Sequence, residues 1–107
     1  MNIILLGLPG AGKGSFAKKL SDDYEMFHLS SGKILKKVIK KNTSLGKVIN
    51  NYIDKGELVP DNITVNLIKK KIKQISNRNI IFDGFPRSIK QAEKLDKILK
   101  KILLWVK

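Results

Sequence analysis

The sequence predicts an α/β fold in which parallel strands of one sheet are joined by crossover helices. Short unbroken apolar runs recur along the chain, notably at 3–6, 80–82 and 102–106, and longer segments with apolar residues at helical spacing separate them. Unbroken runs of this kind are typical of strands that helices bury on both faces. In such folds ligands bind beyond the carboxyl ends of the strands, so we look for site residues there.

The composition fits one globular domain. The chain has 107 residues, 42% of them hydrophobic, and no cysteine. This length suits a modest core, and the lack of cysteine excludes disulfides and zinc sites with thiolate ligands. No apolar run approaches the roughly 18 residues that a membrane span needs. Met1 leads directly into an expected strand, so we expect a cytoplasmic protein with no membrane partner.

The chain is strongly basic, with a formal net charge of +13. A field of this sign attracts anionic nucleotides, and it also attracts nucleic acids without specificity. Only Lys69–Lys71 forms a tight run, and aromatic residues are not interleaved with the lysines as a base-stacking surface requires. We therefore expect no specific nucleic-acid partner, and a non-catalytic basic nucleotide- or nucleic-acid-binding module is the alternative reading.

The most informative segment lies between an expected strand at 2–6 and an expected helix from about 13 to 23. It is Gly7–Ser15, with glycine at four of its positions and a lysine at 13. Without Cβ atoms in the way, successive backbone N–H groups can surround a polyphosphate, and the helix N-terminus and Lys13 add positive charge. The general motif has a hydroxyl residue directly after the lysine, whereas here Ser15 follows one position later. The segment predicts a phosphate-binding loop.

A short strand at 26–29 is expected next, followed by two helices that form a hairpin. Ser30–Gly32 supplies hydroxyl groups that can cap a helix to about Lys41, and Thr43 or Ser44 can cap a second helix that ends at Gly56. Each helix has one apolar face. The hairpin is an excursion from the sheet and a candidate small lid.

The rest of the chain returns to the sheet. Pro60 cannot continue a preceding helix, and Asp61 or Asn62 can cap a new one. A buried strand at 80–82 then ends at Asp83, a helix is expected from 88 to about 101, and 102–106 is the last strand. Asp83 and the glycine-rich loop therefore fall at the same edge of the sheet.

Four motifs match one family in order and spacing. They are Gly7–Ser15, His28–Gly32, Gly56–Asp61, and Phe82–Arg87 followed by Gln91. With them the chain resembles the N-terminal part of adenylate kinase over its whole length. The resemblance implies a P-loop, nucleoside monophosphate kinase-like parallel sheet with crossover helices, truncated. Residues 1–107 would form a partial core, with 30–59 as an AMP-binding helical insertion.

The resemblance implies reversible phosphoryl transfer from ATP to AMP giving two ADP, with Mg²⁺ accompanying ATP and a monomer for the full-length family. Another nucleoside monophosphate kinase is the alternative. Such an enzyme would differ in the acceptor base and share the mechanism. Lys13 and Arg87 would be catalytic, since this chemistry needs charge neutralisation, and Asp83 would hold the metal through water. The implied ATP-binding residues are Gly10, Ala11, Gly12, Lys13, Gly14 and Ser15. The implied AMP-binding residues are Ser31, Lys36, Glu57, Leu58, Val59, Gly84, Phe85, Pro86, Arg87 and Gln91.

The chain departs from the family pattern at several positions. Lys36 replaces an arginine and so loses a planar donor fork, and Lys33 replaces an aspartate and so reverses a charge on the metal side. Phe16 replaces a glutamine, and Ser15 replaces a threonine. Family members continue into a lid with further arginines, so we do not expect efficient catalysis from these residues alone. His28, the sole histidine, is expected to be structural.

Overall fold

The computed structural model describes residues 2–6, 12–75, 79–99 and 104–106, with the backbone alone described for Lys13 and for 104–106. Its strands are β1 (Asn2–Leu5), β2 (Phe27–Ser30), β3 (Ile80–Asp83) and β4 (Leu104–Val106). Its helices are α1 (Lys13–Tyr24), α2 (Ser31–Lys40), α3 (Ser44–Asp54), α4 (Asp61–Gln74) and α5 (Ile89–Leu99). The strands form one parallel sheet in the order β2-β3-β1-β4, which confirms the predicted fold class.

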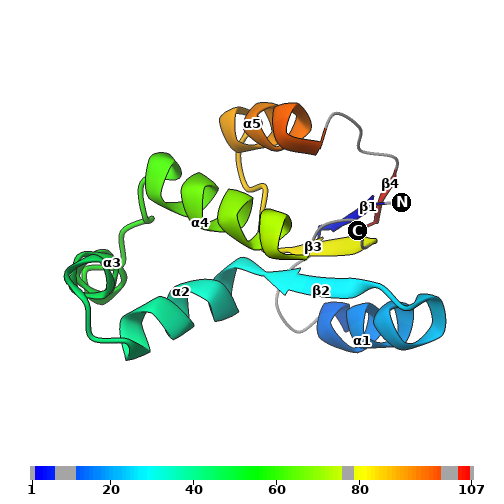
Figure 1. Ribbon diagram of the computed structural model, residues 1–107, viewed down its shortest axis with the longest axis horizontal. Coiled ribbons are helices and arrows are strands. Elements are labelled where there is room, and N and C mark those ends of the chain that lie inside the picture. Colours follow the sequence, from blue (N-terminus) through cyan, green and yellow to red (C-terminus); the bar gives the residue numbers. More distant parts are fainter. Residues whose placement is uncertain (1, 7–11, 76–78, 100–103, 107) are drawn as a thin grey trace.

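Helices cover both faces of the sheet, α1 on one side and α4 and α5 on the other (Figure 1). Side chains of successive strand residues point to opposite faces. Ile4 and Phe82 accordingly belong to the core on the α4 and α5 side, whereas Ile3 and Ile81 belong to the core that includes Ala17 of α1. Burial on both faces explains why the strands are unbroken apolar runs rather than alternating ones.

The α2–α3 hairpin projects away from the sheet (Figure 1). Its two helices approach closely at Gly46, where an added Cβ would lie 2.7 Å from the carbonyl oxygen of Val38. The hairpin ends at Gly56, whose φ of 71° lies in the left-handed region that favours glycine. The predicted end of this helix is therefore confirmed.

Hydroxyl groups begin both hairpin helices, as the sequence predicts. Ser30 Oγ accepts a hydrogen bond from the backbone N–H of Lys33 at 3.3 Å, and Thr43 Oγ1 accepts one from Gly46 at 3.1 Å. These bonds satisfy backbone donors that have no partner within the first turn of a helix. The local capping signals were therefore sufficient to predict where these two helices begin.

The predicted cap of α4 is wrong. Pro60 occupies the cap position, no side chain caps the helix, and Asp61 is already its first residue. The carboxylate of Asp61 is engaged elsewhere, because it accepts a hydrogen bond from Gln91 of α5. A tertiary contact has replaced the expected local one. No helix in the described ranges is both long and apolar enough to cross a bilayer.

Candidate functional site

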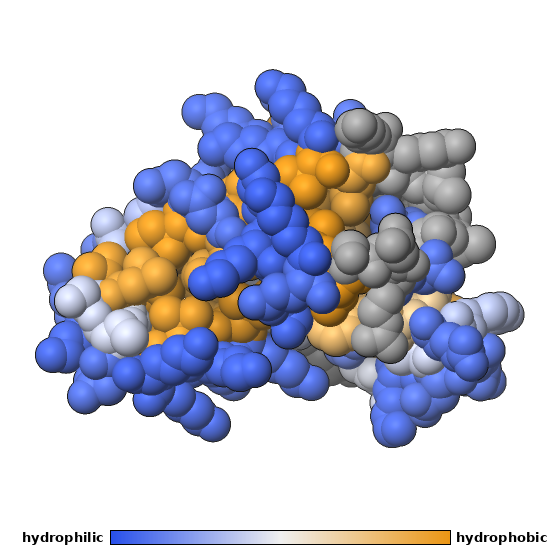
Figure 2. Space-filling model, in the orientation of Figure 1, coloured by the Kyte–Doolittle hydropathy of each residue, from blue (hydrophilic) through white to orange (hydrophobic). Residues whose placement is uncertain are grey.

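A pocket of about 410 Å³ lies between the α2–α3 hairpin and the start of α5. Cavities that bind small molecules typically have volumes of roughly 300–1,000 Å³ and mostly apolar walls with a few polar groups. Leu35, Ile53, Leu58 and Val59 supply apolar wall here. Figure 2 shows hydrophobic side chains gathered on this face where α2, α3 and α4 meet, with hydrophilic ones around them. The pocket therefore suits a small ligand with an apolar body.

The structure brings most of the implied AMP-binding residues to this one pocket. Those that line it are Ser31, Glu57, Leu58, Val59, Gly84, Arg87 and Gln91. Three others do not line it. Phe85 is 1% exposed and belongs to the core beside Phe82, Pro86 is half-buried, and Lys36 is exposed on α2. The side chain of Phe85 is therefore part of the hydrophobic core, and it does not reach the pocket.

The turn after β3 places Arg87 at the pocket. Gly84 has a φ of 81°, and a Cβ on it would lie 2.6 Å from Ser31 Oγ, so only glycine fits there without a shift. Its carbonyl oxygen accepts a hydrogen bond from Arg87 Nε at 2.7 Å. Arg87 forms no ion pair with any described residue. The outer N–H groups of its guanidinium can therefore receive an anionic ligand.

Gln91 supplies a buried polar end to the pocket and is 8% exposed. Its Nε2 donates to Asp61 Oδ1 at 2.8 Å, and its Oε1 accepts from the backbone N–H of Arg87 at 2.7 Å. Its own backbone N–H donates to Ser88 Oγ at 3.2 Å. Asp61 of α4 and Arg87 of the turn between β3 and α5 thus hold this one side chain.

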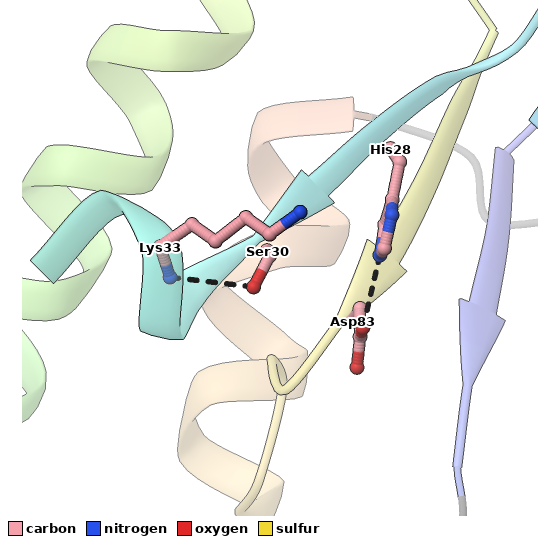
Figure 3. Close-up of polar contacts among 4 residues, drawn as sticks. All are labelled: His28, Ser30, Lys33 and Asp83. Atoms are coloured by element: carbon pink, nitrogen blue, oxygen red, sulfur yellow. Dashed lines mark hydrogen bonds and ion pairs between the residues drawn. The ribbon is translucent and has the colours of Figure 1, made fainter. Parts of the chain in front are cut away.

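Asp83 lies at the carboxyl end of β3, in register with Leu5 of β1 and Ser30 of β2. His28 Nε2 lies 2.9 Å from Asp83 Oδ2 (Figure 3). A carboxylate only accepts, so Nε2 carries the proton and donates. The two side chains are 22% and 14% exposed. The structure thus agrees with a structural role for His28, one that fixes the orientation of Asp83.

Asp83 suits a metal site that substrate phosphates and water complete. No three His, Cys, Asp or Glu side chains in the described ranges are grouped so that they could hold a metal ion by themselves. Mg²⁺ is commonly bound by one or two carboxylates together with substrate phosphates and water. The half-buried carboxylate of Asp83, beside the end of β1, fits that arrangement.

The glycine-rich loop lies mostly outside the described residues, including Gly10, Ala11 and the side chain of Lys13. Its last part is visible at the start of α1. Gly12 is the cap residue with a φ of 81°, and no acidic residue occupies the first turn. Gly14 and Ser15 are exposed there. This helix terminus can therefore favour an anion through its unpaired N–H groups and its dipole.

Several residues that line the pocket were not predicted from the sequence. They are Gly32, Leu35, Ile53, Asp61, Thr64 and Ser88. Leu35 and Ile53 were recognisable only as parts of apolar helix faces, which could equally have been core. Asp61 was interpreted as a helix cap. Gly32 and Asp61 lie within two of the four motifs, and for the other residues the only signal available was closeness in sequence to those motifs.

Comparisons with known proteins give one family. The family model for adenylate kinase matches residues 5–106. An adenylate kinase of Borrelia garinii subsp. bavariensis is 48% identical over 103 residues, which are 95% of this chain and 49% of the relative. Adenylate kinases of Staphylococcus aureus and Archaeoglobus fulgidus are each 46% identical over 103 residues, which are 95% of this chain and 48% of each relative. The chain spans about half the length of these curated relatives.

Proposed function

Because this chain belongs to the adenylate kinase family, we propose that it takes part in reversible phosphoryl transfer from ATP to AMP, giving two ADP. Its contribution would be the AMP site and the phosphate-binding loop for ATP. Residues 30–59 would be the AMP-binding insertion, since they carry much of the pocket wall. A cytoplasmic location is part of this proposal.

One observation carries the proposal: the pocket combines apolar walls, an arginine and a buried carboxamide. The flat faces of a purine would lie against side chains such as Leu35 and Val59. Its polar edge would meet Gln91, and the monophosphate would meet the guanidinium of Arg87, whose planar fork matches phosphate oxygens. AMP has these three parts in one small molecule.

On the donor side, Gly10 to Ser15 would surround the ATP phosphates with backbone N–H groups, and Lys13 would add a mobile positive charge. Asp83 would hold Mg²⁺ through water, and the bound ion would neutralise charge on the donor phosphates. Lys13 and Arg87 would neutralise the transferred group from the two nucleotide sites. No covalent intermediate is required, because such transfer depends on alignment and electrostatic stabilisation.

Titration of AMP into the chain by calorimetry tests the acceptor site directly. Wild type is expected to bind, and Arg87→Ala is expected to weaken binding on the order of 10- to 100-fold because a charge-assisted contact is lost. Lys94→Ala, which removes an exposed charge from α5 at a residue outside the pocket, should leave the affinity unchanged. Absence of AMP binding by folded wild type would overturn the proposal. Formation of ADP from ATP and AMP then measures the activity itself.

Two further measurements separate the alternatives. Competition among AMP, GMP, CMP and UMP distinguishes adenylate kinase from other nucleoside monophosphate kinases. Salt-sensitive RNA binding that Lys13→Ala leaves unchanged would favour a basic binding module. The structure gives that module little support, because in the tight lysine run Lys71 Nζ lies 5.3 Å from the ring centre of Phe27. That lysine packs against its own fold.

A further inference from the structure

The carboxamide of Gln91 is held between two groups of opposite type. The carboxylate of Asp61 offers acceptors only, and the backbone N–H of Arg87 is a donor only. Turning the carboxamide over by 180° would place Oε1 against the carboxylate and Nε2 against the N–H. Only one orientation therefore satisfies both neighbours, whichever way the two atoms are first assigned.

Burial makes this preference strong. Gln91 is 8% exposed, so water is poorly placed to replace hydrogen bonds that a turned carboxamide would lose. The backbone around it is also fixed, since its N–H is bonded to Oγ of Ser88, the residue directly before α5. Asp61 is fixed as the first residue of α4. We call this pair of hydrogen bonds to the Gln91 carboxamide the lock. Its bond to Asp61 joins α4 and α5 through residues that are 30 positions apart in the chain.

A locked carboxamide still has one free position on each atom. Nε2 has a second hydrogen, Oε1 has a second lone pair, and neither atom has another partner among the described residues. Adenine presents a donor at its 6-amino group and an acceptor at N1. A 6-oxopurine presents the reverse, an acceptor at O6 and a donor at N1. A carboxamide that could turn over would pair with either base, but a locked one pairs with one of them.

We propose that Asp61 determines base specificity in this pocket by fixing the orientation of the Gln91 carboxamide, so that 6-aminopurine is selected over 6-oxopurine. Asp61 is a positioning residue, because its effect on the base passes through Gln91. The inference rests on the proposed AMP site and adds to it the residue that rejects the wrong purine. It also explains why the Asp61 carboxylate does not cap α4.

Three nucleotides that differ only at the purine edge test the lock by equilibrium binding to the whole chain. They are AMP, inosine 5′-monophosphate, and purine riboside 5′-monophosphate, which has N1 as an acceptor but no group at C6. Wild type should bind AMP most tightly, then purine riboside monophosphate, then inosine monophosphate. Purine riboside monophosphate lacks only the hydrogen bond to Gln91 Oε1, whereas inosine monophosphate opposes donor to donor and acceptor to acceptor at both atoms of the carboxamide. An order in which inosine monophosphate equals or exceeds purine riboside monophosphate in wild type would overturn the inference.

Asp61→Asn then releases the lock with almost no change of shape. The new carboxamide can accept from Nε2 or donate to Oε1, so it tolerates both orientations of Gln91, while the Arg87 N–H still favours one. The ratio of the affinity for AMP to the affinity for inosine monophosphate should fall about 10-fold, within the range for one bidentate base contact. Asp96→Asn makes the same charge change at an exposed position of α5 and should leave the preference intact.

The outcomes separate this inference from the proposed function. Wild type that binds none of the three nucleotides overturns both. Wild type that binds AMP, with an Asp61→Asn variant that keeps the full preference, leaves the AMP site in place and overturns the role of Asp61. The ranking in wild type needs no variant: an order in which inosine monophosphate equals or exceeds purine riboside monophosphate overturns the fixed orientation of Gln91, and the role of Asp61 with it, even where Asp61→Asn fails to fold.

Discussion

The two nucleotide sites proposed for this chain are built in different ways. Apart from Asp83, the donor side depends on one continuous segment, the glycine-rich loop and the start of α1 at Gly12. The acceptor side depends on side chains that α2, α3, α4, α5 and two connecting turns bring together. A site made by one segment can be recognised from a motif, whereas a site made by many elements exists only once the hairpin has packed beside the sheet.

Two glycines with the same φ of 81°, Gly84 and Gly12, give the largest expected effect and test this contrast. An alanine would be strained at either position. At Gly84 its Cβ would lie 2.6 Å from Ser31 Oγ, whereas at Gly12 none of the described residues beyond its neighbours in the chain comes within 4 Å. We expect Gly84→Ala to lower the free energy of unfolding by about 3 kcal/mol, from strain and overpacking together. Gly12→Ala should cost about 1 kcal/mol, from strain alone.

Urea unfolding of both variants measures the difference. Gly32→Ala is a suitable control, because the residue is helical and an added Cβ would be 3.9 Å from its nearest neighbour, Ser30 Oγ. Its stability should change little or rise slightly, as alanine favours helices. Equal losses at Gly84 and Gly12 would show that the packing of Ser31 against the turn does not constrain the acceptor side.

A pair of charge removals tests whether the two sites are independent. Lys13→Ala is expected to weaken ATP binding about 30-fold and to leave AMP binding unchanged, because its charge would serve the donor phosphates. Arg87→Ala should weaken AMP binding and leave ATP binding unchanged. Calorimetry with each nucleotide separately measures both effects. Loss of both affinities in either variant would contradict a division of the site into two independently built halves.

The same contrast explains which contacts could be predicted from the sequence alone. Caps such as Ser30 and Thr43 act within one turn of helix, so composition and spacing predict them. Asp61 sits where a cap is expected, and its partner Gln91 is 30 residues away. No local rule distinguishes the two uses of such a carboxylate. The error at α4 was therefore an error about tertiary contact and not about helix propensity.

The strand ends show a similar limit. Asp83 could be expected at the site because a polar residue that ends a buried strand faces the ligand crevice. His28 was assigned only a general structural role, because its contact with Asp83 spans 55 residues and depends on the pairing of β2 with β3. At Lys36 the sequence implied more than the structure shows. The family resemblance implies AMP binding there, yet its side chain is exposed on α2 and does not line the pocket.

The caps at the starts of the two hairpin helices give a smaller expected effect. Ser30→Ala and Thr43→Ala should each lower the free energy of unfolding by about 1 kcal/mol, since each removes one capping bond. Ser30 directly precedes the pocket residue Ser31, whereas no residue next to Thr43 lines the pocket. Only Ser30→Ala should therefore also weaken AMP binding, by about 3-fold. Weakening by Thr43→Ala as well would mean that hairpin stability in general, and not local order at Ser31, controls the pocket.

The smallest effect is expected from Lys36→Arg, and it is a gain. Lysine and arginine carry the same charge, but arginine adds a planar fork that binds a phosphate through two parallel hydrogen bonds. We expect a rise in AMP affinity of about 2- to 5-fold, the size of a modest exposed contact, with ATP affinity unchanged. Lys40→Arg, one turn further along the same helix and also exposed, is the matched control. If neither change alters AMP affinity, the cation at position 36 does not reach the phosphate, and Arg87 would carry recognition of the phosphate on the acceptor side without help from α2.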